Sequence, residues 1–314
     1  MELRHLKFFC AIADCGSFTA AAERVCTVQS NITMRVRELE AELGQQLFIR
    51  YKSGVVLTSA GETFLGYARR VLHLIEESRS ALSGMSAPTG RLRLGSMETT
   101  AAIRLPRVLT RYRNRYPDVQ LSLLTGTTVE LIKAVEAHRI DGAFVGGFHD
   151  NTHLVQEAVF QEELVLVSHR EHGSLAAVTQ SMSTQTVLVF RTGCFYRSTL
   201  EHWFYQAGLV PHQVLELGTL DGILSCVAAG MGVTLLPRAV AEQHAVAGEI
   251  RCHALPPELA IVKTVFVRRN DEFVMPALAE FLNLVHAVFD GTDDTPAGRN
   301  DIVPGVFAAG LPAA

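Results

Sequence analysis

SFTAAAERVCTVQSNITMRVRELEAE, residues 17–42, is the stretch that decides the N-terminal fold. Before it, apolar residues at helical spacing predict an amphipathic helix over residues 3–14, which Gly16 ends. Ser17 can cap the next helix by accepting from its free backbone N–H groups. A short break then leads into a longer helix over about 28–43. A short helix, a tight break and a second helix predict a helix-turn-helix.

The longer helix has one apolar face and one polar face. At about 100° per residue its expected buried stripe consists of Ile32, Val36, Leu39 and Leu43. The opposite face and its flanks carry mainly short hydrogen-bonding groups, which can approach base edges in a major groove without ordering a long side chain. These residues are Ser30, Asn31, Thr33, Met34 and Arg37. An ordinary surface helix is the alternative, because patterns this short are common.

A short hairpin is expected directly after the helix-turn-helix. Two strand-like pieces, 47–48 and 55–57, flank basic residues and a glycine. Such a hairpin would form a wing, whose Arg50 and Lys52 can contact the phosphate backbone of DNA. The wing favours the DNA-binding interpretation over that of an ordinary helix pair.

Several spaced elements of the first 60 residues form one known signature. They are Ala21-Ala22-Glu23-Arg24, Gln29-Ser30, Arg37, Leu39-Glu40, Leu43-Gly44, Leu47-Phe48, Arg50, Leu57-Thr58 and Ala60-Gly61. In these residues the chain strongly resembles the LysR-type transcriptional regulators. The resemblance implies that the partner is double-stranded DNA with an inverted repeat in a promoter. The residues implied to contact it are Ser17, Thr19, Gln29, Ser30, Asn31, Thr33, Met34, Arg37, Arg50 and Lys52. Val28 departs from the family, which more often has Ser before the Gln.

From Ser59 a longer helix is predicted, with Ser59 and Glu62 at capping-box spacing. Apolar and small residues then recur in steps of four and three, the spacing of a coiled-coil seam. The seam comprises Phe64, Ala68, Val71, Ile75, Ser78, Leu82 and Met85. We expect this helix to form a homodimer or a dimer of dimers (a homotetramer), because two DNA half-sites need two heads. The alternative is a helix packed on the core of its own domain.

After a linker that ends at Gly90, strands and helices alternate, which predicts an α/β fold with helices on both faces of a parallel or mixed sheet. Strands are expected over 91–96, 119–124, 141–145, 163–168, 187–190, 214–217, 232–236 and 262–267. Helices are expected over 100–116 and 276–289, and after positions 126, 193 and 218. Strands 163–168 and 262–267 would cross between two lobes. Two lobes with two crossings resemble the periplasmic-binding-protein fold that LysR-type regulators use as their effector domain.

The expected fold is therefore α/β with an all-α N-terminal winged helix-turn-helix and a C-terminal two-lobed, periplasmic-binding-protein-like effector domain. The domains are the DNA-binding domain (1–58), the dimerisation linker helix and hinge (59–90), the effector-binding domain (91–290) and a flexible tail (291–314). Lobe I takes about 91–162 and 268–290, and lobe II takes about 163–267.

Four turns lie where strands lead into helices, and there free N–H groups and the helix dipole favour an anion. They are residues 96–100, 126–128, 192–197 and 218–221. By similarity to the family, the first three line the cleft between the lobes and hold a small polar or anionic metabolite. The expected contacts are Ser96, Thr99, Thr100, Thr127, Thr128, Thr192, Cys194, Arg197 and Thr219. The alternative is that the Ser and Thr residues only cap their helices.

Two side chains in these turns bear on the ligand. The carboxylate of Glu98 would repel an anion unless it points away from it, and it could instead bind an amine. An amino acid would suit both features, because its carboxylate could face the helix N-termini and its amine could face Glu98. Cys194 begins a helix, where the dipole lowers a thiol pKa. A cysteine-based redox sensor is therefore an alternative, although no neighbouring cysteine could resolve a sulfenic acid.

The remaining features exclude other classes of protein. With 48% hydrophobic and 19% charged residues, the composition is that of a soluble globular protein, and the net charge of −4 gives no overall attraction to nucleic acid. The six cysteines have no Cys-x-x-Cys spacing, and no signal peptide or membrane span is apparent, so a cytoplasmic protein is expected. No catalytic motif, metal site or cofactor site is recognisable. A solute-binding protein for transport is the alternative for the two lobes, but the wing argues against it.

Overall fold

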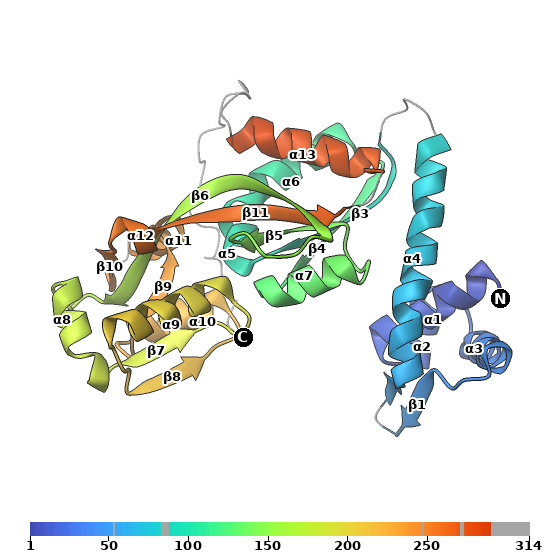
Figure 1. The fold of residues 1–314 in the computed structure, drawn as a ribbon, viewed down its shortest axis with the longest axis horizontal. Helices are drawn as coiled ribbons and strands as arrows, with labels where there is room; N and C mark the ends of the chain where they lie inside the picture. The colour runs from blue at the N-terminus through green and yellow to red at the C-terminus, as the bar shows by residue number, and fades with distance from the viewer. Residues whose placement is uncertain (53, 83–87, 246–247, 271–272, 290–314) are drawn as a thin grey trace, which may run out of the picture.

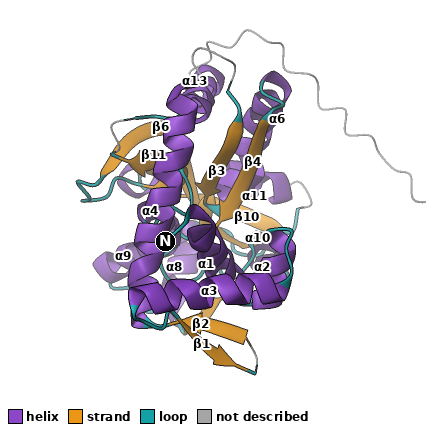
Figure 2. Cartoon of the chain, turned by 90° about the vertical axis from the view of Figure 1, so that its right-hand side faces the viewer, coloured by secondary structure: helices purple, strands orange, loops and turns teal. Residues whose placement is uncertain are grey.

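The computed structural model describes residues 1–52, 54–82, 88–245, 248–270 and 273–289. The expected tail 291–314 and the seam position Met85 lie outside these residues. At the N-terminus, α1 (Leu3–Cys15), α2 (Phe18–Arg24) and α3 (Gln29–Leu43) pack with a hairpin of β1 (Phe48–Tyr51) and β2 (Gly54–Leu57). Figure 1 shows this head set apart from the larger body of the molecule, and Figure 2, viewed from the side of the head, shows β1 and β2 below α3.

The head follows the sequence pattern closely, with three local differences. Ser17 caps α2 by accepting from the Ala20 backbone N–H, as expected. The helix α3 begins at Gln29, with Val28 as an N-cap residue that makes no side-chain bond. Leu43 is 37% exposed, so the prediction that it belongs to the buried stripe is wrong. It is the last helical residue, where α3 runs past the core. The wing strands are longer than expected, and Arg50 therefore lies in β1 rather than at the tip.

A single long helix, α4 (Ser59–Leu82), leads out of the head. Its N-terminus is capped by Thr58, whose Oγ1 accepts from the Gly61 backbone N–H at 2.9 Å, and not by the expected box of Ser59 and Glu62. Gly61 lies against the wing, because a Cβ at this position would be 2.1 Å from the Leu47 carbonyl oxygen. The first turns of α4 are thus fixed to the head without room for a side chain.

Two of the residues expected in the coiled-coil seam of α4 are covered by the chain's own head. Phe64 and Ala68 pack into the core of the head, so the alternative of a helix packed on its own domain holds for the first turns. The exposed large apolar residues of α4 are Val71 and Leu82, which belong to the expected seam, and Tyr67 and Leu74, which do not. At about 100° per residue they fall within an arc of about 80° and form a stripe along α4.

Lobe I of the body is an α/β layer built on a parallel core. β3 (Gly90–Ser96) pairs in parallel with β4 (Val119–Thr125) and β5 (Gly142–Gly146), and β5 pairs antiparallel with β11 (Ile261–Arg269). The covering helices are α5 (Glu98–Ile103), α6 (Leu105–Arg115), α7 (Thr128–Glu136) and α13 (Pro276–Phe289). The expected helix 100–116 is two helices that meet at Arg104. The predicted packing of 276–289 on this lobe is confirmed, because Tyr112 donates to the Ala277 carbonyl at 2.7 Å.

One long strand, β6 (Leu154–His169), runs through both lobes (Figure 1). Its first part pairs with β11, and its second part pairs with β9 (Thr234–Pro237) and β10 (Ile250–Ala254). Lobe II adds the parallel pair β7 (Thr186–Val189) and β8 (Gln213–Glu216). Its helices are α8 (Leu175–Gln180), α9 (Phe195–Ala207), α10 (Leu220–Ala228), α11 (Arg238–Ala245) and α12 (Pro257–Ala260). The two expected crossing strands are therefore β6 and β11.

Candidate functional site

The polar face of α3 is open to solvent. Gln29, Ser30, Met34 and Arg37 are exposed, and Asn31 and Thr33 are half-buried. The residues Gln29, Ser30, Thr33, Met34 and Arg37 line one continuous surface hollow together with Glu38 and Ala41. The structure thus brings most of the expected recognition residues onto one surface, while Ile32, Val36 and Leu39 anchor the helix from behind.

Internal contacts already hold part of this surface in place. Thr19 on α2 lies 3.3 Å from the Gln29 side-chain oxygen, which joins the two helices of the motif. The Asn31 amide donates to Thr27 Oγ1 at 2.9 Å and is drawn towards the turn between them. The Ser17 hydroxyl is used by the α2 cap. Ser30 and Arg37 therefore remain the side chains most available for base contacts.

The wing presents its two basic residues differently. The Arg50 guanidinium lies 4.2 Å from the centre of the Phe18 ring, a cation–π contact that orients it against the head. Lys52 lies beyond β1 and is exposed. Both cations stay on the surface of the head, and a lysine at the end of the hairpin is well placed for a phosphate contact.

A buried polar network connects the two lobes. The Thr99 hydroxyl of lobe I lies 3.1 Å from the Tyr196 hydroxyl of lobe II, which donates to Glu162 Oε2 on β6 at 2.9 Å. Arg104 approaches the other oxygen of this carboxylate at 3.5 Å. Burial raises the pKa of Glu162, and the hydrogen bond from Tyr196 and the positive charge of Arg104 oppose that rise. Thr99 is thus engaged in linking the lobes.

Beside this network Thr100 carries a hydroxyl without a partner. Its side chain is 0% exposed, and its Oγ1 makes no hydrogen bond with any described residue. Ser96, at the end of β3, donates instead to the neighbouring Met97 carbonyl at 2.9 Å. Since a buried unbonded hydroxyl carries a desolvation cost, Thr100 is the group in this region that a polar ligand would satisfy.

Acidic side chains of the protein itself lie at two of the expected anion positions. Glu98 of lobe I reaches across to lobe II, where its Oε1 accepts from the Leu220 backbone N–H at the start of α10, at 2.9 Å. Glu130 forms the predicted capping box with Thr127, and its bond from the Thr127 backbone lowers its pKa. Thr128 accepts from the Gly146 backbone N–H at 3.3 Å. Glu98 therefore points from lobe I to the N-terminus of a helix in lobe II.

The third and fourth turns are less suited to a ligand than the sequence indicated. Arg197 makes ion pairs with Glu201 at 2.8 Å and Glu216 at 2.7 Å, so its charge is already matched. Thr219 caps α10, and both Thr192 and Thr219 are exposed to solvent. In the part of the chain that the structure describes, no hydrogen bond joins these three residues to Thr99 or Thr100 of α5.

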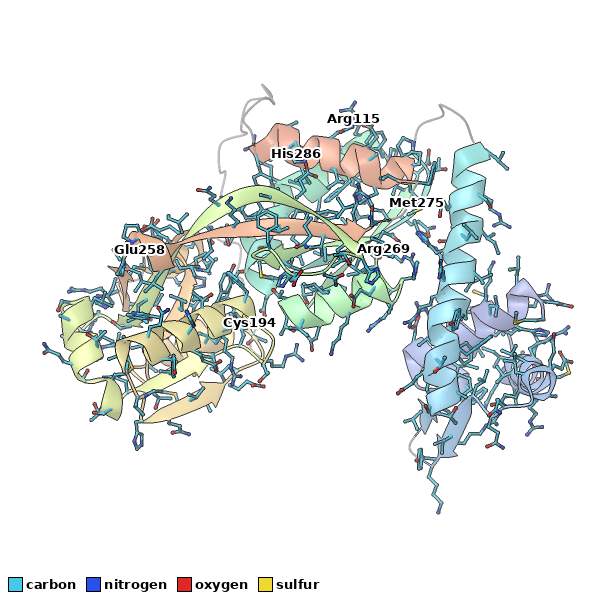
Figure 3. All side chains as sticks on the ribbon, in the orientation of Figure 1. Arg115, Cys194, Glu258, Arg269, Met275 and His286 are labelled. Atoms are coloured by element: carbon cyan, nitrogen blue, oxygen red, sulfur yellow. The ribbon has the colours of Figure 1, made fainter. Side chains whose placement is uncertain are left out.

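Cys194 lies at the start of α9, where lobe II faces lobe I (Figure 3). It is buried, and desolvation raises its thiol pKa against the opposing bonds from the Arg197 and Tyr196 backbones. The expectation of a lowered pKa is therefore wrong, because burial outweighs the helix terminus. A raised pKa disfavours the thiolate that a redox sensor requires.

Sequence reasoning missed Arg104, Glu162 and Tyr196. Glu162 is a carboxylate within a strand otherwise rich in apolar residues, and that position was the only signal in the sequence. Tyr196 and Arg104 carry no motif, and only the packing of α9 and α5 on β6 brings them together. Among the described residues, no helix is long and apolar enough to cross a membrane, and no cluster of three His, Cys, Asp or Glu side chains could hold a metal ion.

Geometry and comparison agree on the class of protein: a DNA-binding regulator with a two-lobed effector domain. Residues 3–62 match the family model described as "Bacterial regulatory helix-turn-helix protein, lysR family", and residues 86–290 match "LysR substrate binding domain". The chain belongs to the LysR family of transcriptional regulators.

Individual relatives extend over nearly the whole chain. The HTH-type transcriptional regulator GltR of Bacillus subtilis is 43% identical over 282 residues, which covers 90% of this chain and 95% of that protein. The solved structure of full-length CbnR with its target DNA is 28% identical, with a TM-score of 0.62 over 91% of this chain and 99% of that one. A full-length OxyR variant from Pseudomonas aeruginosa, 21% identical, shares the fold with a TM-score of 0.69 over 92% and 94% of the two chains.

Proposed function

We propose that this regulator changes its DNA binding when a small polar metabolite enters the cleft between its lobes. The observation that carries the proposal is the fully buried, unbonded Thr100 hydroxyl beside a polar network that connects both lobes. A ligand that bonds to Thr100 and disturbs this network would favour one lobe arrangement over another. The ligand can shift the equilibrium only by its differential affinity for the two arrangements.

The acidic groups in the cleft narrow the chemistry of the effector. Glu98 accepts from the α10 terminus, and Glu162 lies buried below Tyr196. A purely anionic ligand would have to displace Glu98 from Leu220, whereas a ligand with both an acidic and an amino group could use the carboxylate that it displaces. We therefore favour a small zwitterion such as an amino acid over a simple anion.

Thr100→Val tests this site. In a thermal-shift screen of amino acids and small carboxylates, we expect at least one compound to raise the melting temperature of the wild-type protein. Thr100→Val should weaken its binding about tenfold, because one hydrogen bond to a buried group is lost. Thr110→Val, an exposed position on α6, is the matched control and should bind as the wild type does. If a compound bound equally well to the wild type, Thr100→Val and Thr127→Val, the proposed effector site would be wrong.

The same regulator is proposed to read an inverted repeat through two heads. The residues Ser30, Thr33, Met34 and Arg37 would enter the major groove, and Lys52 would contact the backbone beside it. A protein that binds chromosomal DNA must act where the chromosome lies, so the proposed place of action is the cytoplasm of a bacterium. Two half-sites require two chains, so the dimer is part of the proposal.

Leu74→Glu tests the dimer surface. Leu74 is 61% exposed at the centre of the stripe on α4, and this stripe would be covered by the α4 helix of a second copy. A charge there should shift the sedimentation of the protein from dimer, or dimer of dimers, towards smaller species. Val210→Glu introduces the same charge at an exposed apolar position remote from α4 and should leave the assembly unchanged. If Leu74→Glu sedimented as the wild type does, the dimer interface would not lie on this stripe.

A further inference from the structure

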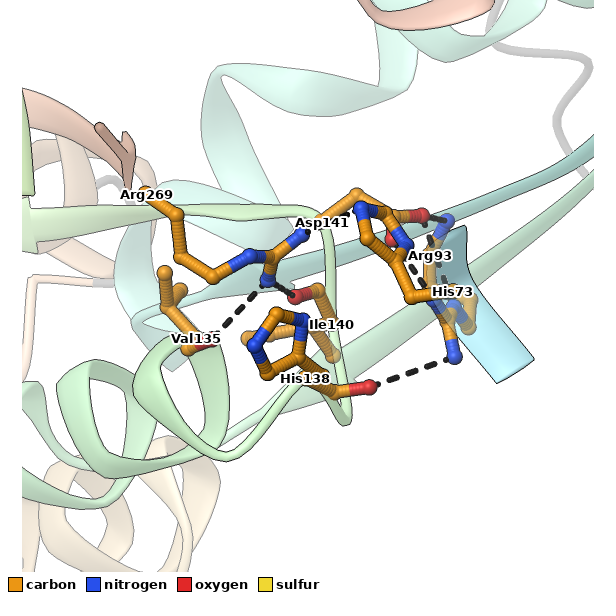
Figure 4. Close-up of polar contacts among 7 residues, drawn as sticks. All are labelled: His73, Arg93, Val135, His138, Ile140, Asp141 and Arg269. Carbon is orange, nitrogen blue, oxygen red and sulfur yellow. Dashed lines mark hydrogen bonds and ion pairs between the residues drawn. The ribbon is translucent and has the colours of Figure 1, made fainter. Parts of the chain in front are cut away.

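In the middle of α4 a buried polar contact joins the helix to lobe I. Arg269 Nη2 lies 3.1 Å from His73 Nε2, and the two residues are 9% and 7% exposed. The His73 ring also packs on the His138 ring, with 5.3 Å between centroids. Figure 4 shows these side chains converging from α4, from β11 and from the loop before β5. Since arginine only donates, His73 must accept at Nε2 and is therefore neutral in this contact.

The surface that receives His73 is held rigidly by lobe I. Arg269 Nη1 donates to the Val135 and Ile140 carbonyls, each at 2.9 Å. Arg93 on β3 donates to the His138 carbonyl at 3.3 Å and makes an ion pair with Asp141 at 2.7 Å. Two arginines thus fix both ends of the loop over residues 137–141, whose His138 adopts a left-handed φ of 54°. A non-glycine residue keeps this conformation only where its surroundings hold it there.

The same contact is connected to the cleft through β11. Thr264 on this strand lies close enough to Glu162 to lower the pKa of that carboxyl group, which accepts from Tyr196 and pairs with Arg104. Arg269 is the last residue of the strand, about 17 Å further along at the usual rise per residue. Because β11 is paired on both sides, with β5 and β6, it moves as a stiff element between these two points.

We infer that Arg269 and His73 couple the effector domain to the DNA-binding head. A change at Glu162 displaces β11, Arg269 carries the displacement to His73, and α4 passes it to the head. Arg269 and His73 are positioning residues in this scheme and touch neither ligand nor DNA. The role of the ligand in starting the movement rests on the proposed function, whereas the contact between α4 and lobe I does not.

Hydrogen exchange of the full-length protein without ligand tests the contact. In His73→Phe, which keeps a ring but removes the acceptor, backbone amides of α4 around residues 70–78 should exchange about tenfold faster, as expected for loss of a hydrogen bond to a charged group. His73→Gln retains an acceptor and should restore most of the protection. His202→Phe, at an exposed position on α9, is the matched control. Equal exchange of α4 in wild type and His73→Phe would overturn the inference.

A double-mutant cycle on DNA binding tests the coupling. Tyr196→Phe removes the bond to Glu162 and should change the affinity for the DNA upstream of the gene by about threefold or more. In a His73→Phe background the same substitution should have no effect. Additive effects would show that the cleft reaches the head by another route. If no metabolite raised the melting temperature in the thermal-shift screen, the proposed effector would be in doubt. The double-mutant cycle could still be interpreted, because it measures DNA binding and needs no ligand.

Discussion

Arg37→Ala is expected to weaken binding to the DNA upstream of the gene by about tenfold to a hundredfold. Arg37 is exposed on the face of α3 opposite the buried Val36 and Leu39, so its guanidinium can reach a base edge when the helix enters the major groove. A bidentate contact from arginine to guanine is worth about 1–3 kcal/mol of discrimination between bases. Ser30→Ala, at the start of the same face, should cost less, because a hydroxyl makes a single bond. Fluorescence anisotropy with a labelled fragment measures both.

The control for Arg37→Ala is a matched loss of positive charge elsewhere. Arg113→Ala removes an exposed arginine of α6, remote from the head, and should leave the affinity unchanged. Loss of a base contact should also reduce discrimination between specific and scrambled DNA, whereas loss of a phosphate contact weakens both alike. Unchanged binding by both Arg37→Ala and Ser30→Ala would show that α3 is not the recognition helix.

Gly61→Ala is expected to destabilise the head by about 3 kcal/mol, at the upper end of the usual cost of overpacking. The new methyl group would lie 2.1 Å from the Leu47 carbonyl oxygen and 3.0 Å from Leu57 Cδ2, so backbone rather than a flexible side chain must move. The same carbonyl accepts from the Thr58 backbone N–H at 3.0 Å, and that bond fixes the start of α4. Thermal unfolding should show an early transition of the head, and DNA binding should fall with it.

Gly66→Ala is the matched control on the same helix. A Cβ at Gly66 would meet no atom within 4 Å. Alanine also has the higher helix propensity, by about 1 kcal/mol, so this variant should melt at or above the wild-type temperature. If Gly61→Ala melted like Gly66→Ala, the close approach between α4 and the wing would not constrain the head.

Local signals in the sequence predicted the parts of the fold that depend on neighbouring residues. The caps at Ser17 and Thr127 and the final helix over 276–289 are determined within a few positions along the chain. On α4, the spacing alone could not tell that Phe64 and Ala68 of the expected seam are covered by the head, whereas Val71 and Leu82 are exposed. Phe64 is partly covered by α1, an element that lies about 50 residues earlier in the chain and whose Phe9 ring centroid is 5.1 Å away.

The candidate effector site could be predicted only in part, for a related reason. Hydroxyls at strand ends indicated the turn that carries Thr99 and Thr100, both of which are buried, and Thr99 contacts the other lobe through Tyr196. Their partners come from distant segments: Tyr196 is 97 residues from Thr99, and Leu220 is 122 residues from Glu98. The pKa of Cys194 depends on how completely α9 is covered, which the residue's place at a helix start does not reveal.

Because α4 approaches the Leu47 backbone closely at Gly61, the helix and the head move together as one rigid unit. With 24 residues the helix is about 36 Å long, and its first turns cannot bend away from the head. A tilt of about 5° at the far end would therefore displace the head by about 3 Å, close to the 3.4 Å between successive base pairs of DNA. An angular change too small to alter the packing of either lobe would be enough to move a recognition helix out of register with its half-site by one base step.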